Sequence, residues 1–310
     1  MPLPTARFMC LNGKVVPYEE CQIHAFSGVV KYGAGVFEGL RGYWNPDRGD
    51  MYVFRLKEHL DRLHYGMRVL RLDPMPTEAD FHDGLLAMLR ANDLRETAHL
   101  RIIAFLDGDD ELGATGPTGW VCGAVPRVRS KAVTDGVHVA VSTYARLADN
   151  ALPPRVKATA NYVNNRAAEL EAKRNGYGGV LMLTAQGKVS EGSGACFFMV
   201  RDGVLHTPDV ASDILESITR DTVLKLAAEL GLTVLERTID RHEVYAAEEA
   251  FYCGSGFEVI PILSLDRLAI GTGKPGPVTR AIQKAYFDVA EGHVDSHPEW
   301  RTPVYGNAAP

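Results

Sequence analysis

The sequence of 310 residues has few cysteines and no long hydrophobic run. Its five cysteines are Cys10, Cys21, Cys122, Cys196 and Cys253. This odd number, with no close pair in the sequence, argues against a disulfide framework and fits small core residues in a reducing compartment. No apolar run approaches the roughly 20 residues that span a bilayer, and residues 1–13 lack the long apolar stretch of a signal peptide. We therefore expect a cytoplasmic protein with no membrane association and no metal site.

Positive charge is not in excess either, since 33 Lys and Arg residues stand against 39 Asp and Glu residues, and the formal net charge is −6. A surface for nucleic acid needs clustered basic residues, whereas here only the run Arg127-Val128-Arg129-Ser130-Lys131 is dense in them. We therefore expect no nucleic-acid partner. The chain length and the 46% of hydrophobic residues allow two domains of ordinary size.

Periodicity along the chain predicts interleaved helices and strands. Apolar residues at helical spacing predict helices over residues 56–70, 78–89, 161–174, 219–230 and 277–289. A hairpin with an Asn12-Gly13 turn is predicted over residues 8–16, and further strands over 51–54, 99–106, 120–125, 137–142, 179–183, 196–200, 233–236 and 249–253. No regular βαβ repeat appears, so we expect an α+β fold rather than a doubly wound sheet.

The basic run after Pro126 interrupts this pattern and is the candidate linker between two domains. We expect a small N-terminal α/β domain over residues 1–125, a linker over 126–136, and a larger C-terminal domain over 137–310. The tail from His293 is rich in proline, glycine and polar residues, so we expect it to pack poorly.

Lys157 is the first residue with candidate chemistry. It follows the stiff pair Pro153-Pro154 and precedes a predicted helix. A lysine that forms an imine must be neutral at working pH, which requires a lowered pKa, and the small and apolar neighbours of Lys157 suit that demand. Most lysines are solvated surface residues, so this interpretation depends on the segments that follow.

Three later segments carry groups that fit a phosphorylated pyridine cofactor. Glu191 lies in Ser190-Glu191-Gly192-Ser193-Gly194, where a carboxylate could face a ring nitrogen, although a simple turn is the commoner use of such a segment. Ile218-Thr219-Arg220-Asp221 begins a predicted helix, which could hold a phosphate or be an ordinary N-cap. Gly254-Ser255-Gly256 follows a predicted strand and could be a second phosphate-binding turn or a plain loop.

Two segments in the first half complete the set. Tyr32 and Phe37 lie in a glycine-rich stretch, Tyr32-Gly33-Ala34-Gly35-Val36-Phe37-Glu38-Gly39-Leu40-Arg41, and could wall an apolar pocket. Arg62 has a fork-shaped guanidinium that suits a phosphate. The alternative for Arg62 is an ion pair with Glu58, one helical turn earlier.

Together and in this order, the segments resemble the class IV (fold-type IV) pyridoxal phosphate-dependent aminotransferases, and most of all the branched-chain amino acid aminotransferases. The resemblance runs from Phe8 to about Val289. It implies a D-amino acid aminotransferase-like fold of two α/β domains, with the cofactor between them. It also implies a homodimer or a larger homo-oligomer, because in the family a loop of one subunit completes its neighbour's pocket.

The resemblance also implies a role for each candidate residue. Lys157 would form the internal aldimine with pyridoxal 5′-phosphate and move the proton. The implied cofactor-binding residues are Tyr162 at the phenolic oxygen, Glu191 at the pyridine nitrogen, Leu215 against the ring, and Arg62, Ile218, Thr219 and Ser255 at the phosphate. The implied substrate-binding residues are Tyr32, Phe37, Gly39, His99, Arg101, Arg127 and Gly256. The implied reaction moves an amino group from an L-amino acid, of branched-chain or hydrophobic type, to a 2-oxo acid such as 2-oxoglutarate.

Two positions depart from the branched-chain pattern. His99 stands where those enzymes carry tyrosine, and Arg127 where many bacterial members place tryptophan; the loop over residues 107–114 is also shorter and more acidic. These changes either polarise the substrate pocket or point to solvent. The alternatives are a transaminase for (R)-amines or D-amino acids, an aminodeoxychorismate lyase, and a pyridoxal phosphate-binding protein without catalysis. The Phe37-Glu38-Gly39 motif and Arg101 favour the L-amino acid transaminase.

Overall fold

The computed structural model describes residues 6–108 and 111–306, so Asp109 and Asp110 of the acidic loop lie outside the described residues. The chain forms two compact units. The first unit comprises the described residues up to Val128, residues Val156–Ala160, and the chain from Asp288 onward. The second unit comprises Arg129–Arg155 and Asn161–Phe287. The first boundary thus falls inside the expected linker, but two segments expected in the C-terminal domain pack with the first unit instead.

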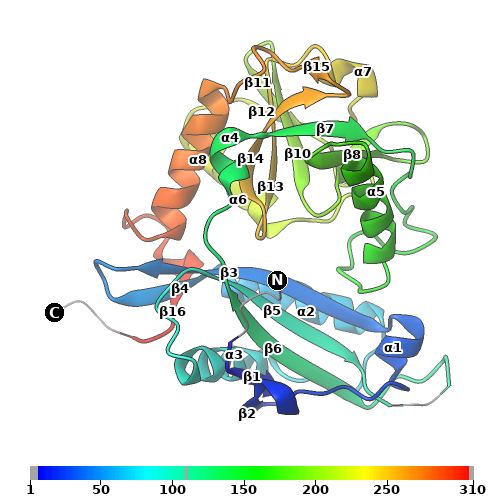
Figure 1. Cartoon of the computed structure of the whole chain (residues 1–310), viewed down its shortest axis with the longest axis vertical. Helices are drawn as coiled ribbons and strands as arrows, with labels where there is room; N and C mark the ends of the chain where they lie inside the picture. Colours follow the sequence, from blue (N-terminus) through cyan, green and yellow to red (C-terminus); the bar gives the residue numbers. More distant parts are fainter. Residues whose placement is uncertain (1–5, 109–110, 307–310) are drawn as a thin grey trace. The chain divides into compact units, whose positions relative to one another are not determined.

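The described residues of the first unit form an antiparallel sheet of seven strands in the order β16-β4-β3-β5-β6-β1-β2 (Figure 1). The strands are β1 (Phe8–Leu11), β2 (Lys14–Pro17), β3 (Gly35–Asn45), β4 (Asp50–Phe54), β5 (Ala98–Leu106), β6 (Thr118–Pro126) and β16 (Arg301–Pro303). The predicted hairpin turn is confirmed, since Asn12 and Gly13 both have positive φ, of 49° and 83°. The 11-residue strand β3 was not predicted.

The helices of the first unit are η1 (Tyr18–Glu20), α1 (Gly28–Tyr32), α2 (Leu56–Val69) and α3 (Glu78–Ala91), with the 3-10 turn η2 (Pro298–Trp300) near the end. Helix α3 begins with a capping box, in which Thr77 accepts from the backbone of Asp80 and the Asp80 carboxylate accepts from the backbone of Thr77. One core joins α2 and α3 to the sheet. It includes Leu40, Leu60, Leu63, Phe81, Leu85, Leu100 and Ile102.

The expectation of a poorly packed tail was wrong for the described residues after His293. Strand β16 pairs with β4, and Trp300 and Val304 are buried. Arg55 stacks over the Trp300 ring at 4.7 Å. The composition of the tail concealed these two apolar anchors, because they are isolated among polar residues.

The described residues of the second unit form a mixed sheet of nine strands. Eight follow the order β12-β11-β10-β13-β14-β7-β8-β9, and β15 pairs with β14. The strands are β7 (Val137–Val141), β8 (Gly179–Leu183), β9 (Val189–Gly192), β10 (Cys196–Arg201), β11 (Val204–Thr207), β12 (Val234–Glu236), β13 (Glu249–Gly254), β14 (Glu258–Leu265) and β15 (Leu268–Ala269). The pairs β11–β12, β7–β14 and β7–β8 are parallel and the others antiparallel, so the expected α+β class is confirmed.

The helices around this sheet are α4 (Lys131–Asp135), α5 (Tyr162–Arg174), α6 (Ile218–Glu229), α7 (Arg241–Val244) and α8 (Pro277–Ala290). The core includes Leu181, Phe197, Met199 and Tyr252. Helix α4 lies within the expected linker, yet Val133 from it is buried in this core. The segment after Val128 is therefore a packed part of the second unit.

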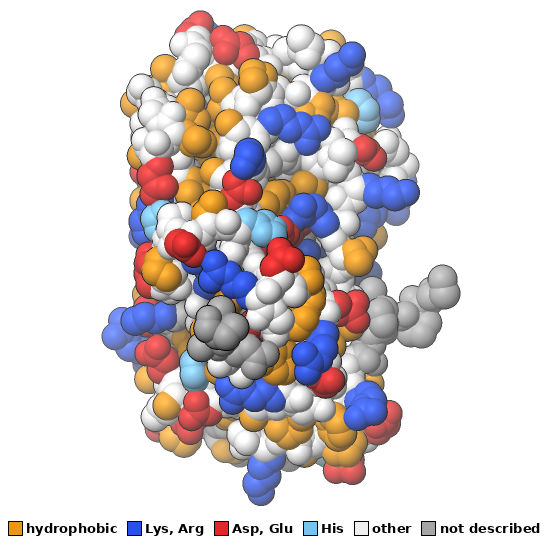
Figure 2. Space-filling view, turned by 90° about the vertical axis from the view of Figure 1, so that its left-hand side faces the viewer, with side chains coloured by type: hydrophobic (Ala, Val, Ile, Leu, Met, Phe, Trp, Pro, Cys, Tyr) orange, Lys and Arg blue, Asp and Glu red, His pale blue; other side chains and the backbone are white. Residues whose placement is uncertain are grey.

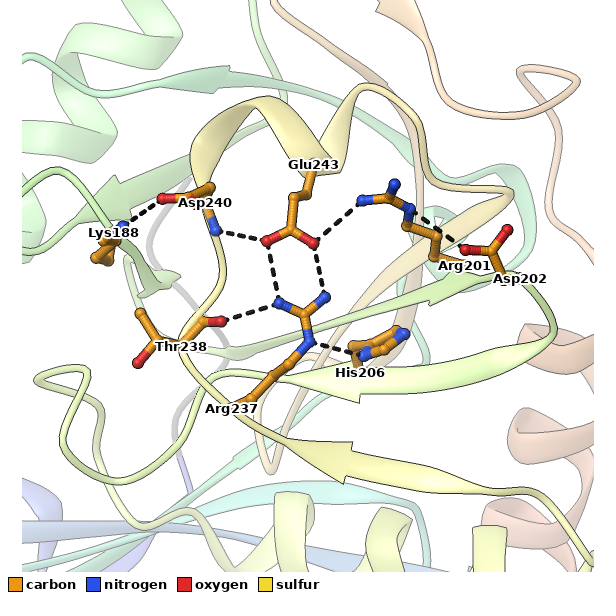
Figure 3. Close-up of polar contacts among 8 residues, drawn as sticks. All are labelled: Lys188, Arg201, Asp202, His206, Arg237, Thr238, Asp240 and Glu243. Carbon is orange, nitrogen blue, oxygen red and sulfur yellow. Dashed lines mark hydrogen bonds and ion pairs between the residues drawn. The ribbon is translucent and has the colours of Figure 1, made fainter.

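An ion network joins the strands β10 and β11 to the short helix α7 (Figure 3). The Arg237 guanidinium donates to both carboxylate oxygens of Glu243, at 3.0 and 2.7 Å, and Arg201 donates to the same group at 3.1 Å. Arg237 also donates through Nε to Nδ1 of His206. The hydrogen bonds from Arg237 are the largest cause that lowers the pKa of Glu243 to about 2, and the charges of Arg237 and Arg201 act in the same direction.

Charges of both signs are interspersed on the face seen in Figure 2, without a continuous field of one sign. None of the helices in the described part of the chain is long and apolar enough to cross a membrane.

Candidate functional site

The backbone around Lys157 extends the first unit's sheet at the start of β3. Phe37 N–H donates to the carbonyl of Lys157 at 3.0 Å, and Val36 forms an isolated bridge with Ala158. Val156 and Ala158 are buried, whereas Lys157 between them is partly exposed. Because alternate residues of an extended segment point to opposite sides, the buried neighbours anchor the backbone and direct the lysine side chain away from the core.

The amine of Lys157 lies over an aromatic ring. Its Nζ is 5.0 Å from the ring centroid of Phe37, and the guanidinium carbon of Arg101 is 4.7 Å from the same centroid. Phe37, one of the expected substrate residues, therefore lies beside the expected catalytic lysine, and Arg101, another of them, contacts the same ring. The ring of Phe37 is largely buried and gives this group an apolar surface.

A buried carboxylate, Glu38, holds Arg62. Nε and Nη2 of Arg62 donate to Oε1 and Oε2 of Glu38 at 2.7 and 2.8 Å, and Nδ1 of His59 lies 2.7 Å from Oε2. Burial alone would raise the pKa of Glu38, but the charges and hydrogen bonds of Arg62 and His59 outweigh it and hold that pKa well below its usual range. The ion pair between Arg62 and Glu58 that was considered as an alternative is not formed, because Glu58 pairs with Arg55.

Arg101 and His99 lie on neighbouring positions of the same sheet face. Arg101 is paired in register with Gly39, and His99 with Arg41. Burial, followed by the charges of Arg101 and Arg127, lowers the pKa of His99 to about 3. The ring is therefore neutral near pH 7, and its Nε2 can accept from Nη2 of Arg101, 3.3 Å away. A Cβ at Gly39 would lie 3.1 Å from the His99 ring, so glycine keeps this face open.

Tyr32 and Arg127 lie outside the strands β3 and β5 that carry Phe37, His99 and Arg101. Tyr32 ends α1 and is 43% exposed, with the amine of Lys31 over its ring. Arg127 follows β6, and its backbone is fixed by Thr97 and by Nη1 of Arg41. Its side chain is exposed, although its charge reaches His99.

The second unit holds a buried carboxylate at Glu191 on β9. Nε of Arg146 donates to Oε1 at 2.9 Å, and the backbone N–H of Leu215 donates to Oε2 at 3.2 Å. Cys196 Sγ is 3.8 Å from Oε2. Arg146 also donates to the side-chain oxygen of Asn165. Sequence reasoning missed Arg146, whose neighbours carry no motif; the need of a buried carboxylate for a cationic partner was the one available indication.

The start of α6 forms a cradle of donors in the second unit. Ser217 caps the helix by accepting from the Arg220 N–H, which leaves the N–H groups of Ile218 and Thr219 outside the helix's own hydrogen bonds. The hydroxyls of Thr219 and Ser255 are 3.3 Å apart. A helix N-terminus with two hydroxyls beside it suits a phosphate group. Tyr162 begins α5 and is partly exposed, and Gly256 lies in the turn between β13 and β14.

The chemistry of these groups matches a phosphorylated aldehyde cofactor with a ring nitrogen. Each unit by itself holds groups suited to part of such a cofactor: an amine and an oriented arginine in the first, a fixed carboxylate and a phosphate-type cradle in the second. A metal centre finds no such support, since in residues 6–108 and 111–306 no three His, Cys, Asp or Glu side chains are grouped to hold an ion.

Comparison with known proteins agrees with this chemistry. The family model described as amino-transferase class IV matches residues 35–265. The branched-chain-amino-acid aminotransferase of Pseudomonas aeruginosa is 37% identical, over 94% of this chain and 96% of the relative. A crystal structure of the branched-chain amino acid aminotransferase of Thermobaculum terrenum in its PLP form is 41% identical with a TM-score of 0.91, over 97% of this chain and 99% of that one. The branched-chain aminotransferase of Thermoproteus uzoniensis, solved with norvaline, is 37% identical with a TM-score of 0.92, over 97% and 100%.

The resemblance found in the sequence is thereby confirmed, together with the fold-type IV architecture. The match spans nearly the whole length of these relatives. The chain belongs to the class IV aminotransferases and is an aminotransferase.

Proposed function

We propose that this protein is a pyridoxal 5′-phosphate-dependent transaminase that moves an amino group from an L-amino acid to a 2-oxo acid such as 2-oxoglutarate. The observation that carries the proposal is the setting of Lys157. Its backbone is bonded to β3 between two buried residues, and its amine lies over the ring of Phe37. A lysine so held has the fixed position that covalent attachment of an aldehyde requires.

The residues present fit the cofactor. Glu191 would bind the pyridine nitrogen, since Arg146 and the Leu215 N–H fix its carboxylate. Arg62, the start of α6, Thr219 and Ser255 would bind the phosphate. Tyr162 would bind the phenolic oxygen, and Leu215 would pack against the ring. When bound, the cofactor supplies an electron sink for the charge that develops at the substrate Cα.

The protein's own groups would then move the proton. Nζ of Lys157 would take the proton from the substrate Cα and deliver it to the aldehyde carbon of the cofactor.

The substrate surface has both an apolar and a cationic part. Phe37 would offer an apolar ring to the substrate side chain, and Gly39 adds no side chain beside His99; Gly256 is the substrate-binding residue proposed in the second unit. Arg101 supplies a charge for a carboxylate, with His99 as a neutral neighbour. We therefore propose branched-chain or other hydrophobic L-amino acids as donors, which the names of the relatives also support. Arg127, with its exposed side chain, would modulate the outer part of this surface.

We further propose a homodimer or a larger homo-oligomer. Tyr32 is exposed on a short helix, so it can reach a neighbouring subunit's pocket rather than its own. The cysteines are all free thiols and four of the five are buried, which supports the cytoplasm as the compartment.

A half-reaction screen tests the function. The visible absorbance of the cofactor-loaded protein is followed after adding L-leucine, L-glutamate, D-alanine or (R)-1-phenylethylamine without an acceptor. We expect the L-amino acids to shift the absorbance of the wild type and of Lys173→Ala, an exposed-lysine control, but not of Lys157→Ala. Full transamination by Lys157→Ala would contradict the role of this lysine, and a response to D-alanine or the amine alone would contradict the L-specificity.

A further inference from the structure

Glu38 is a fully buried carboxylate in the middle of β3, and nothing in the proposed reaction uses it. Its side chain is 0% exposed, and its two partners, His59 and Arg62, are 2% and 12% exposed. A carboxylate taken out of water costs several kcal/mol unless its partners compensate, and a hydrophobic residue would fill the same space without that cost. Packing alone therefore does not explain why a carboxylate occupies position 38.

The geometry of the pair between Arg62 and Glu38 fixes the orientation of the guanidinium as well as its position. The fork of Arg62 meets both oxygens of Glu38 through Nε and Nη2, and such a bidentate pair sets the plane of the guanidinium. The two acids on Arg62's own helix have other partners, since Glu58 pairs with Arg55 at 2.6 Å and Asp61 with Lys57 at 2.8 Å. The strand β3 therefore orients Arg62 through Glu38.

His59 secures the carboxylate from the other side. Its Nδ1 lies 2.7 Å from Oε2 of Glu38. Burial lowers the pKa of His59 against the opposing pull of Glu38. Because a carboxylate only accepts, Nδ1 of His59 donates this hydrogen bond. The carboxylate of Glu38 is thus held by hydrogen bonds from both Arg62 and His59.

The same strand also holds Lys157. Phe37 N–H donates to the Lys157 carbonyl, and the next residue, Glu38, holds Arg62. Two consecutive residues of β3 therefore set the positions of the amine and of the arginine. A cofactor joined to the protein at its aldehyde carbon and at its phosphate would need these two groups at a constant spacing.

We propose that Glu38, supported by His59, is a positioning residue for the cofactor phosphate that acts through Arg62. The inference rests on the proposed function, which assigns Arg62 to the phosphate. The inference implies that Glu38 strengthens the binding of ligands that carry a phosphate and does not affect the binding of the same ring without a phosphate.

The test compares the affinities of cofactor-free protein for pyridoxal 5′-phosphate and for pyridoxal, measured by absorbance titration. We expect Glu38→Gln to weaken pyridoxal 5′-phosphate binding roughly tenfold and to leave pyridoxal binding within about twofold. Glu58→Gln is the matched control, since Glu58 lies on the same helix as Arg62 but pairs with Arg55. In Arg62→Gln the preference for the phosphorylated ligand should already be reduced, because only the start of α6, Thr219 and Ser255 remain for the phosphate. Adding Glu38→Gln should lower the preference no further.

Glu38→Gln leaves a cationic Arg62 without its counter-charge, so the melting temperature of the cofactor-free protein is measured alongside. If that variant does not fold, Glu38→Asp replaces it, because it keeps the charge but retracts it by one methylene; its preference for the phosphate should also fall. A folded Glu38 variant with the wild-type ratio of the two affinities overturns the inference alone. A wild type that binds neither ligand overturns the proposed function, and the inference with it.

Discussion

Nε of Arg146 donates to Oε1 of Glu191 at 2.9 Å, and the two side chains are only 3% and 5% exposed. Neither could be buried without the other at a tolerable cost. The pair also keeps the carboxylate of Glu191 in one orientation, because the Leu215 N–H holds its second oxygen.

Removing the arginine of this pair should destabilise the protein. We expect Arg146→Met to lower the free energy of unfolding by about 3–5 kcal/mol, since it leaves a buried carboxylate without a counter-charge. Arg155→Met is the control, because Arg155 pairs with Glu216 at the surface, and it should cost about 0–1 kcal/mol. Urea denaturation of the cofactor-free protein measures both. Equal losses in the two variants would contradict a special role for the buried pair.

His99 should stay neutral over the ordinary pH range. Its pKa of about 3 in the folded protein lies below the 6.5 of an ordinary histidine. The unfolded chain therefore binds a proton first, and His99 should reduce folding stability progressively as pH falls from 6.5 towards 3. NMR of the histidine ring protons should show no titration of His99 between about pH 5 and 8. Arg101→Gln should raise this pKa; an unshifted titration in that variant would exclude Arg101 as a cause.

Glu243, unlike His99, should stabilise the folded protein near neutral pH. The hydrogen bonds from Arg237 lower its pKa from 4.5 to about 2, so its stabilising effect is complete above pH 4.5 and is lost as pH falls towards 2. We expect Glu243→Gln to lower the free energy of unfolding by on the order of 1–3 kcal/mol near pH 7. The difference from the wild type should shrink in acid. A pH-independent difference in chemical denaturation curves would argue that packing, and not charge, causes the loss.

A methyl group at Gly84 should be costly even though it favours helix. A Cβ there would lie 2.6 Å from the Trp120 ring and 2.9 Å from Cys10 Sγ. We expect Gly84→Ala to lose about 1–3 kcal/mol through overpacking, which exceeds the gain of roughly 1 kcal/mol in helix propensity. At Gly113 a Cβ meets nothing within 4 Å, so Gly113→Ala should be neutral. Melting temperatures of the two variants check this; a stable Gly84→Ala would mean that the indole shifts freely.

Much of the fold could be predicted from the regular spacing of apolar residues in the sequence. Helices α2 and α3 and the Asn12-Gly13 hairpin follow the predicted segments closely, because their apolar spacing and turn residues act locally. Strand β3 escaped prediction, because its glycines and its buried Glu38 and Arg41 disrupt any alternation of apolar residues. The charge of Glu38 is compensated by His59 and Arg62, 21 and 24 residues further along the chain, which no local window contains.

The residues of the candidate site also fall into those that the sequence could predict and those that it could not. Lys157, Glu191 and the α6 start could be chosen from the sequence because a chemical requirement selects those residue types. Arg146 and the link from Glu38 to Arg62 could not, because each depends on a contact between segments distant in sequence. The roles of the chosen residues stay predictions until the variants are measured.

Lys157 belongs by its backbone hydrogen bonds to a unit whose main sequence ends at Val128. The chain passes from one unit to the other at Val128, returns at Val156, leaves again after Ala160 and comes back at Asp288. Neither unit is therefore a contiguous module. A fragment cut at Val128 would lack both the lysine segment and strand β16, and a chimaera that exchanged residues 129–310 as one block would pair a foreign lysine segment with β3. Recombination between relatives should succeed only where β3 and residues 156–160 are inherited together.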